Sequence, residues 1–253
     1  MIRLTLAEGF EAQRTFWRSP PAAVFVVILP LLFLSVLGSM EPRGWPAGGP
    51  RFADVLVPGI VVMSLLSASF SNLAASLCLL RDTGVLKRLR GTPLPPAVFL
   101  CGRALSCLVT VAVQTLLVAA IGAATLGASL PGVERWPAVA LVLVLGTTCF
   151  AACAAAFTAL IPHFEVAPAM VNGLALILLL LSGAWNPELG LPGPLDTVLH
   201  GLPLGALLDG LRDAWAGTAQ SAFPALAVLA GWTLGALALA RAVFRWEPHA
   251  RTR

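Results

Sequence analysis

Long apolar stretches dominate the chain and are separated by short polar segments. A membrane-spanning helix needs about 20 mostly apolar residues. Six stretches meet this requirement, with limits at about 22–40, 55–80, 98–127, 137–160, 166–184 and 221–244. Pro30 falls inside the first stretch and is expected to kink it, which the interior of a helix bundle tolerates. The pattern predicts an all-α membrane protein with six transmembrane helices.

Three segments outside the predicted spans carry patterns of their own. In residues 1–20 an apolar face at helical spacing predicts an amphipathic entry helix on the inner membrane surface; it consists of Ile2, Leu6, Phe10 and Trp17. Residues 81–96 form a basic loop that is too long to be a simple turn. Residues 185–217, rich in Pro and Gly, are expected outside, with short external helices before the last span. The last of these helices has one apolar face, made of Leu204, Leu208, Leu211 and Trp215.

The composition excludes a water-soluble globular domain. The chain is 58% hydrophobic and 11% charged, whereas soluble domains contain about 45–50% apolar and about 25% charged residues. So few charges cannot cover a water-facing surface, and residues 1–253 are therefore expected to form a single membrane domain. The five cysteines lie in or beside apolar runs, so we expect neither disulfides nor a metal site from them.

The basic residues are distributed unevenly between the two sides of the predicted membrane, which sets the orientation. With both termini in the cytoplasm, the inner segments hold 12 basic residues, namely Arg3, Arg14, Arg18, Arg81, Lys87, Arg88, Arg90, Arg103, Arg241, Arg245, Arg251 and Arg253. The outer segments hold 4, namely Arg43, Arg51, Arg135 and Arg212. The net charge of +4 thus reflects topology, and no basic stripe for nucleic acid is present. Scarce lysine beside abundant Ala, Arg, Pro and Gly is typical of a bacterial source, so we expect a multi-pass protein of the bacterial cytoplasmic membrane.

The predicted spans contain polar but almost no ionisable side chains. Six of the polar side chains are candidates for a substrate path, namely Ser64, Ser67, Ser71, Asn72, Gln114 and Asn172. Small polar residues in spans also serve helix packing and local hydrogen bonds, and the sequence leaves both interpretations open. An ion-driven carrier needs a buried charge to carry its coupling ion, and repeated halves would also be expected. Neither feature is visible.

Catalytic and nucleotide-binding motifs are also missing from the 253 residues. They contain no G-x-S-x-G, no H-E-x-x-H and no pair of carboxylates within a predicted span. A P-loop needs G-x-x-x-x-G-K-[ST], but the single lysine, Lys87, follows Leu86. We therefore expect a chain that is not an enzyme and binds no cofactor. Any ATP and Mg²⁺ would be bound by a partner on the cytoplasmic face.

The loop at 81–96 is the natural docking place for such a partner. Asp82 favours the start of a helix, the basic residues that follow favour its end, and Gly91 and Pro93 stop it. Val85, Leu86 and Leu89 give this helix a small apolar face. Such a helix can either enter a groove on a partner or rest on lipid headgroups, and residue chemistry alone favours neither.

The sequence RDTGVLKRLRGTPL at 81–94 resembles the loop between spans two and three of ABC-2-type permeases. That family has an acidic residue, a spacer, Gly, a basic Leu-rich helix and Thr-Pro-Leu, with Glu usual where Asp82 stands here. The entry helix, the six spans and the outer segment also resemble its layout. The resemblance implies a coupling helix that contacts a separate ABC ATPase subunit, with this role carried by Asp82, Gly84, Val85, Leu86, Arg88 and Leu89. It also implies a second permease chain, identical or different.

The resemblance implies the membrane subunit of an ATP-driven exporter that works by alternating access. Apolar spans favour a hydrophobic or amphipathic cargo, and drug-like efflux is preferred to the export of a lipid or a lipid-linked glycan. Two alternatives from other classes are an ion-driven secondary carrier and a membrane scaffold that transports nothing.

Overall fold

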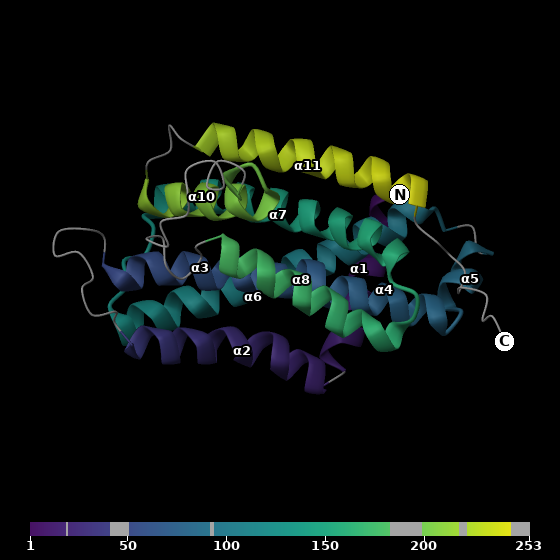
Figure 1. The fold of residues 1–253 in the computed structure, drawn as a ribbon, viewed down its shortest axis with the longest axis horizontal. Coiled ribbons are helices and arrows are strands. Elements are labelled where there is room, and N and C mark those ends of the chain that lie inside the picture. Colours follow the sequence, from purple (N-terminus) through teal and green to yellow (C-terminus); the bar gives the residue numbers. More distant parts are fainter. Residues whose placement is uncertain (19, 41–50, 92–93, 183–198, 218–221, 244–253) are drawn as a thin grey trace.

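A computed structural model describes residues 1–18, 20–40, 51–91, 94–182, 199–217 and 222–243. Within these ranges every regular element is a helix, and the long helices run roughly parallel to one another (Figure 1). The predicted all-α architecture is therefore confirmed for this part of the chain. Several predicted segments lie partly outside the described residues, namely 81–96 at 92–93, 166–184 at 183–184, 185–217 at 185–198, and 221–244 at its first and last residues.

Five helices among the described residues are long and apolar enough to cross a membrane. The first runs from Phe52 to Asp82 and joins α3 (Phe52–Leu66), η1 (Ser67–Asn72) and α4 (Leu73–Asp82). The second is α6 (Pro96–Leu126). The third joins η2 (Val133–Arg135), α7 (Trp136–Phe157) and η3 (Thr158–Leu160). The fourth joins η4 (Phe164–Val166) and α8 (Ala167–Leu181), and the fifth lies within α11 (Ala222–Val243).

The first predicted span corresponds to α2 (Pro20–Ser39), a helix of 20 residues with Pro30 inside it. The apolar part Val26–Ser39 is shorter than the other five candidates. The predicted stretches at 55–80, 98–127, 137–160, 166–184 and 221–244 each coincide with one of the five long helices to within a few residues. That α2 also crosses the membrane stays a prediction.

The centre of the bundle is α3. Thirteen of its fifteen residues are buried, and a helix that is apolar on all sides is stable only when other helices surround it. It packs against α2, α6, α7 and α10. The long helices α6 and α7 both begin with a proline in the first turn, where its missing N–H costs nothing. Gly127, with φ +63°, ends α6 in the left-handed conformation.

The two ends of the bundle carry different polar contacts. At one end, here named the α10 end, the Asp54 carboxylate accepts a 2.6 Å hydrogen bond from the Ser129 N–H. The Trp215 indole N–H donates to the Ser129 carbonyl at 2.9 Å, and Arg135 donates to the Ala216 carbonyl at 2.8 Å. The opposite end carries the short helix α5 (Val85–Arg90) and is named the α5 end (Figure 1).

The predicted entry helix is present as α1 (Ile2–Trp17). It packs against α6 through Gly9 and Gly102, where the two backbones approach so closely that a Cβ on Gly102 would lie 3.1 Å from the Gly9 nitrogen. The predicted apolar residues Ile2, Leu6, Phe10 and Trp17 are exposed. Its place on the inner membrane surface stays a prediction, and exposed apolar residues are what that position requires.

The helix expected near the end of the 185–217 segment is α10 (Pro203–Ala216). Its predicted apolar face, namely Leu204, Leu208, Leu211 and Trp215, is buried. The helix packs against α7, α11 and α3, and Leu207 lies where a side chain on Gly146 of α7 would be. Before it, the Gly201 carbonyl accepts a 3.0 Å hydrogen bond from Trp232, about midway along α11. Thus α10 belongs to the bundle and is not a peripheral cover.

Candidate functional site

The coupling helix predicted within 81–96 is shorter than expected and begins later. Asp82 is the last residue of α4, whereas α5 begins at Val85. The prediction that Asp82 starts this helix is therefore wrong. The reason is Gly84, whose φ of +72° places it in the left-handed conformation that ends a helix. The Gly84 N–H donates to the Arg81 carbonyl at 3.0 Å, which closes α4.

The side chains of α5 divide between the bundle and its surroundings. Leu86 is 1% exposed and belongs to the main core, and Leu89 packs against that core. Lys87, Arg88 and Arg90 are exposed. Leu86 thus fastens α5 to its own chain, and the surface that α5 offers at this end is basic. The ATPase-contacting role of Asp82, Gly84, Val85, Leu86, Arg88 and Leu89 stays a prediction.

Arg81 holds the end of α4 against the connection between α7 and α8. Its side chain is 2% exposed. Its guanidinium donates to the carbonyls of Thr158 at 3.0 Å, Ile161 at 2.9 Å and Pro162 at 3.1 Å. The planar fork of arginine suits several fixed acceptors at once.

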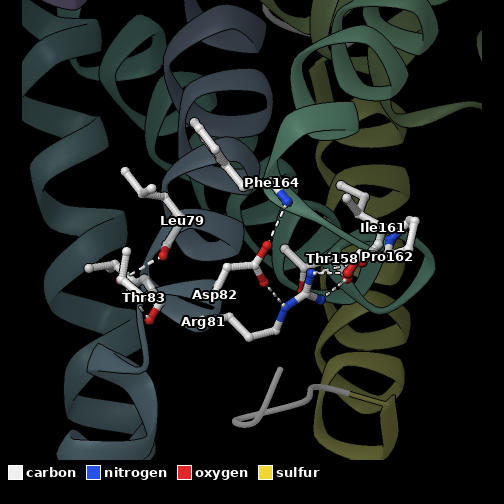
Figure 2. A network of polar contacts seen from close by, with 9 residues as sticks. Leu79, Arg81, Asp82, Thr83, Thr158, Ile161, Pro162 and Phe164 are labelled. Atoms are coloured by element: carbon white, nitrogen blue, oxygen red, sulfur yellow. Dashed lines mark hydrogen bonds and ion pairs between the residues drawn. The ribbon is translucent and has the colours of Figure 1, made fainter. Parts of the chain in front are cut away.

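Asp82 completes the same network (Figure 2). One carboxylate oxygen accepts from Arg81 Nε at 3.1 Å, and the other accepts from the backbone N–H of Phe164 at 2.6 Å. We name Arg81 and Asp82, with their partners between Thr158 and Phe164, the Arg81–Asp82 clamp. It is built by adjacent residues on α4 and by a segment about 80 positions later in the chain. Sequence reasoning assigned Arg81 to membrane topology and missed the clamp.

Four of the six predicted path residues line one cavity of about 520 Å³. Ser67, Ser71 and Asn72 reach it from the middle of the Phe52–Asp82 helix, and Asn172 reaches it from α8. Apolar residues of α2, α3, α4 and α8 form the rest of the wall. Ligand pockets typically have volumes of about 300–1,000 Å³, mostly apolar walls and a few polar groups that orient the ligand. The cavity has these properties.

A π-helical segment, η1, brings the three residues of the Phe52–Asp82 helix to the same cavity. In a π-helix the hydrogen bonds run from i to i+5, and such segments are rare and frequently occur at functional sites. The wider turn places residues four and five apart on the same side, so Ser71 and Asn72 both accompany Ser67. No pattern in the sequence indicated η1.

The other two predicted path residues lie away from this cavity. Ser64 is fully buried, and its hydroxyl donates to the Ile60 carbonyl at 2.8 Å in its own helix. Gln114 is 2% exposed, and its amide N–H donates to the Val26 carbonyl, which joins α6 to α2. Both side chains have packing roles in this structure, while their part in substrate passage stays a prediction.

A larger cavity of about 910 Å³ lies among α7, α8, α11 and residues 201–203. Its lining is apolar except for the Cys153 thiol and the Trp232 indole N–H, and the latter already donates to Gly201. Such walls accept an apolar chain but orient nothing. We therefore place the candidate path in the smaller cavity, which has four polar side chains.

Comparison with known protein families agrees with this architecture. A family model described as ABC-2 type transporter matches residues 10–215. The chain belongs to the ABC-2 type transporter family. The match begins within α1 and ends one residue before the end of α10, so it includes α5, the clamp and the smaller cavity. No curated protein matches the chain.

Membership of the ABC-2 family makes the chain a multi-pass membrane protein and a membrane component of a transporter. Among the residues that the structure describes, no group of three or more His, Cys, Asp or Glu side chains could hold a metal ion. The candidate functional features of the described residues are a basic helix at one end, a polar cavity among the spans, and the clamp beside the helix.

Proposed function

We propose that the chain is the permease subunit of an ATP-driven exporter in the bacterial cytoplasmic membrane, with six spans and both termini inside. Two permease chains, identical or different, would form a twelve-span core. A separate ABC ATPase subunit, which binds the ATP and Mg²⁺, would dock on each α5. Alternating access would then follow from ATP-driven movement of the two α5 helices.

The observation that supports this proposal most is the exposed basic surface of α5. Lys87, Arg88 and Arg90 are exposed beside a helix that Leu86 fixes to the bundle. A helix that is anchored to the bundle on one side and exposed on the other can transmit displacement from a partner. The 253 residues contain no P-loop of their own, and in this proposal ATP hydrolysis takes place on that partner.

Reversal of the charge at Arg88 is expected to weaken the ATPase complex. Arg88→Glu changes an exposed side chain, so the fold should be kept while complementary charge at the interface is lost. Loss of a close charge pair at an interface costs about 2–5 kcal/mol, enough to reduce capture of the ATPase by tenfold or more. The measurement is co-purification of the ATPase with the tagged permease from native membranes after mild detergent extraction.

Arg14→Glu provides the matched control, because Arg14 is also an exposed arginine but lies on α1 and not on α5. This variant should capture the ATPase as the wild type does. Equal loss in both variants would mean that general charge, and not α5, governs docking. Absence of an ATPase from the wild-type preparation would contradict the exporter proposal and favour a secondary carrier or a scaffold.

The cargo that fits the smaller cavity best is an uncharged or weakly polar amphipathic compound. Within the described residues its lining carries hydroxyl and amide groups but no charged side chain. A fully charged cargo would enter this cavity without compensation for its lost hydration. We therefore favour drug-like efflux, with lipid or lipid-linked glycan export as the alternative for the same architecture.

Removal of an amide from the cavity is expected to weaken cargo binding without affecting assembly. Asn172→Leu keeps the approximate volume but removes hydrogen-bonding groups worth about 0.5–1.5 kcal/mol each. We expect KM for transport to rise about two- to tenfold with little change in kcat. Uptake of a fluorescent amphipathic compound by inverted vesicles measures both quantities.

Thr148→Val is the control for this experiment. Thr148 is half-buried on α7, and its hydroxyl donates within its own helix, to the Val144 carbonyl at 2.7 Å. Its variant should transport with unchanged KM. If Asn172→Leu and Asn72→Leu also leave KM unchanged for every compound transported, the cargo does not pass through this cavity.

A further inference from the structure

We propose that the Arg81–Asp82 clamp makes α5 and the α7–α8 connection move as one unit. Displacement of α5 then reaches the spanning helices α7 and α8, although neither is adjacent to α5 in the sequence. This inference rests on the proposed function, because it concerns how the movement of α5 spreads. Arg81 and Asp82 act here as positioning residues within the permease.

The α4 side of the clamp is directly continuous with α5. Asp82 ends α4, and only Thr83 and Gly84 separate it from Val85. Both intervening residues are held by hydrogen bonds: the Thr83 N–H donates to Leu79 at 2.9 Å and the Gly84 N–H to Arg81 at 3.0 Å. Any displacement of α5 therefore acts on Arg81 and Asp82 first.

The other side of the clamp is the whole connection between two spans. Thr158 lies in η3 at the end of the α7 span, Ile161 and Pro162 form the turn, and Phe164 begins η4 before α8. Arg81 and Asp82 bind the beginning, the middle and the end of this connection through its backbone. Contacts to backbone atoms transmit displacement of the main chain itself, independently of the side chains in the connection.

The clamp is too strong to be a passing surface contact. Arg81 is almost fully buried, and hydrogen bonds to charged groups in a water-poor environment are stronger than neutral ones. Because α8 carries Asn172 of the cavity and α4 continues from η1, the clamp joins both polar walls of the candidate path to α5. A movement at α5 would thus shift both walls together.

Distance measurements on the wild-type clamp test this directly. Spin labels are placed at Gly91, directly after α5, and at Glu165 in η4, both exposed and both outside the basic surface of α5, in a Cys101→Ser background diluted with unlabelled chain. A second pair joins Gly91 to Thr125, an exposed residue near the far end of α6. In the complex with its ATPase, ATP binding should shift the Gly91–Thr125 distance distribution and leave the Gly91–Glu165 distribution in place.

Either of two results overturns the inference. A Gly91–Glu165 distance that changes as much as the Gly91–Thr125 distance means that the clamp does not hold the two segments together. A Gly91–Thr125 distance that does not change when ATP binds means that α5 has no movement to transmit. Failure to recover any ATPase with the permease is a different result, because it contradicts the proposed function before the clamp is tested.

Conservative variants give a second test with a functional readout. Arg81→Lys keeps the charge, but an ammonium group cannot reproduce the arginine fork toward three carbonyls and Asp82. We expect the complex to assemble and hydrolyse ATP, while ATP hydrolysed per compound exported rises by about tenfold, a change within the usual range of coupling between two sites. Asp82→Asn, which keeps an oxygen for the Phe164 N–H, should show a smaller rise.

The matched control is Arg14→Lys, the same substitution at an exposed position of α1. Its ratio of ATP hydrolysed to compound exported should equal that of the wild type. A wild-type ratio in Arg81→Lys would overturn the inference. Loss of the ATPase from Arg81→Lys, with the permease still folded, would also overturn it, since the clamp would then serve docking and not transmission.

Discussion

Replacement of Arg81 by Met is expected to lower the thermal stability of the protein severely. The substitution keeps much of the side-chain length and apolar stem but removes every donor of the guanidinium. The carbonyls of Thr158, Ile161 and Pro162 and the Asp82 carboxylate lose a common partner. Breaking a buried charge network in this way costs about 3–5 kcal/mol, a large part of the total stability of most proteins.

The measurement is the temperature of half-unfolding of the detergent-solubilised permease, followed by the fluorescence of a thiol-reactive dye that reports exposure of the buried cysteines. Arg14→Met is the control, because the Arg14 side chain is 58% exposed and its ion pair with Glu11 spans 3.9 Å. Such exposed pairs contribute about 0–1 kcal/mol. Equal unfolding temperatures of the two variants would contradict the conclusion that the hydrogen bonds of Arg81 stabilise the α5 end.

The sequence was sufficient to predict the five long apolar helices, because the lengths of apolar runs are set by the thickness of the membrane. The runs at 55–80 and 98–127 correspond to helices at Phe52–Asp82 and Pro96–Leu126. The entry helix and α10 were also predictable, since each has an apolar face at helical spacing. What periodicity could not reveal is that α10 is enclosed by α3, α7 and α11.

The candidate site was only partly predictable. The polar residues Ser67, Ser71, Asn72 and Asn172 stand out in apolar spans, and the structure brings them to one cavity. The π-helical turn that aligns three of them depends on packing around the Phe52–Asp82 helix. A pattern with 3.6 residues per turn does not reveal such a local change. Ser64 was therefore predicted together with Ser67 and Ser71, although it does not line the cavity.

The start of α5 and the role of Arg81 were missed for different reasons. Aspartate is common at helix starts, but here Gly84 ends the preceding helix after Asp82. The Asp82 carboxylate instead accepts hydrogen bonds from Arg81 and the Phe164 N–H. Arg81 resembles any positive residue at the inner end of a span. Its true partners are backbone carbonyls about 80 residues away, and carbonyls leave no signal in a sequence.

Replacement of Gly102 by Leu is expected to separate α1 from α6. A Cβ at Gly102 would lie 2.7 Å from the Glu8 Cβ and 3.1 Å from the Gly9 nitrogen, so α1 itself has to move away. That movement disrupts the Glu8–Arg103 ion pair at 3.7 Å and the contact of the Gln13 amide with Ser106 at 2.7 Å. Overpacking of this kind costs about 1–3 kcal/mol. The separation is measured by hydrogen exchange of the α1 amides, which should become faster. The unfolding temperature, which should fall, is the second measurement.

Gly235→Leu distinguishes crowding at the α1–α6 contact from a general effect of adding a large side chain to a spanning helix. Gly235 lies on α11, and a Cβ there meets nothing within 4 Å, so this variant should keep both the unfolding temperature and the exchange rates of α1. If Gly102→Leu also leaves α1 protected, the helix does not depend on close backbone contact with α6. Its attachment would then rest on the polar contacts alone, and Arg103→Met would be the variant that releases it.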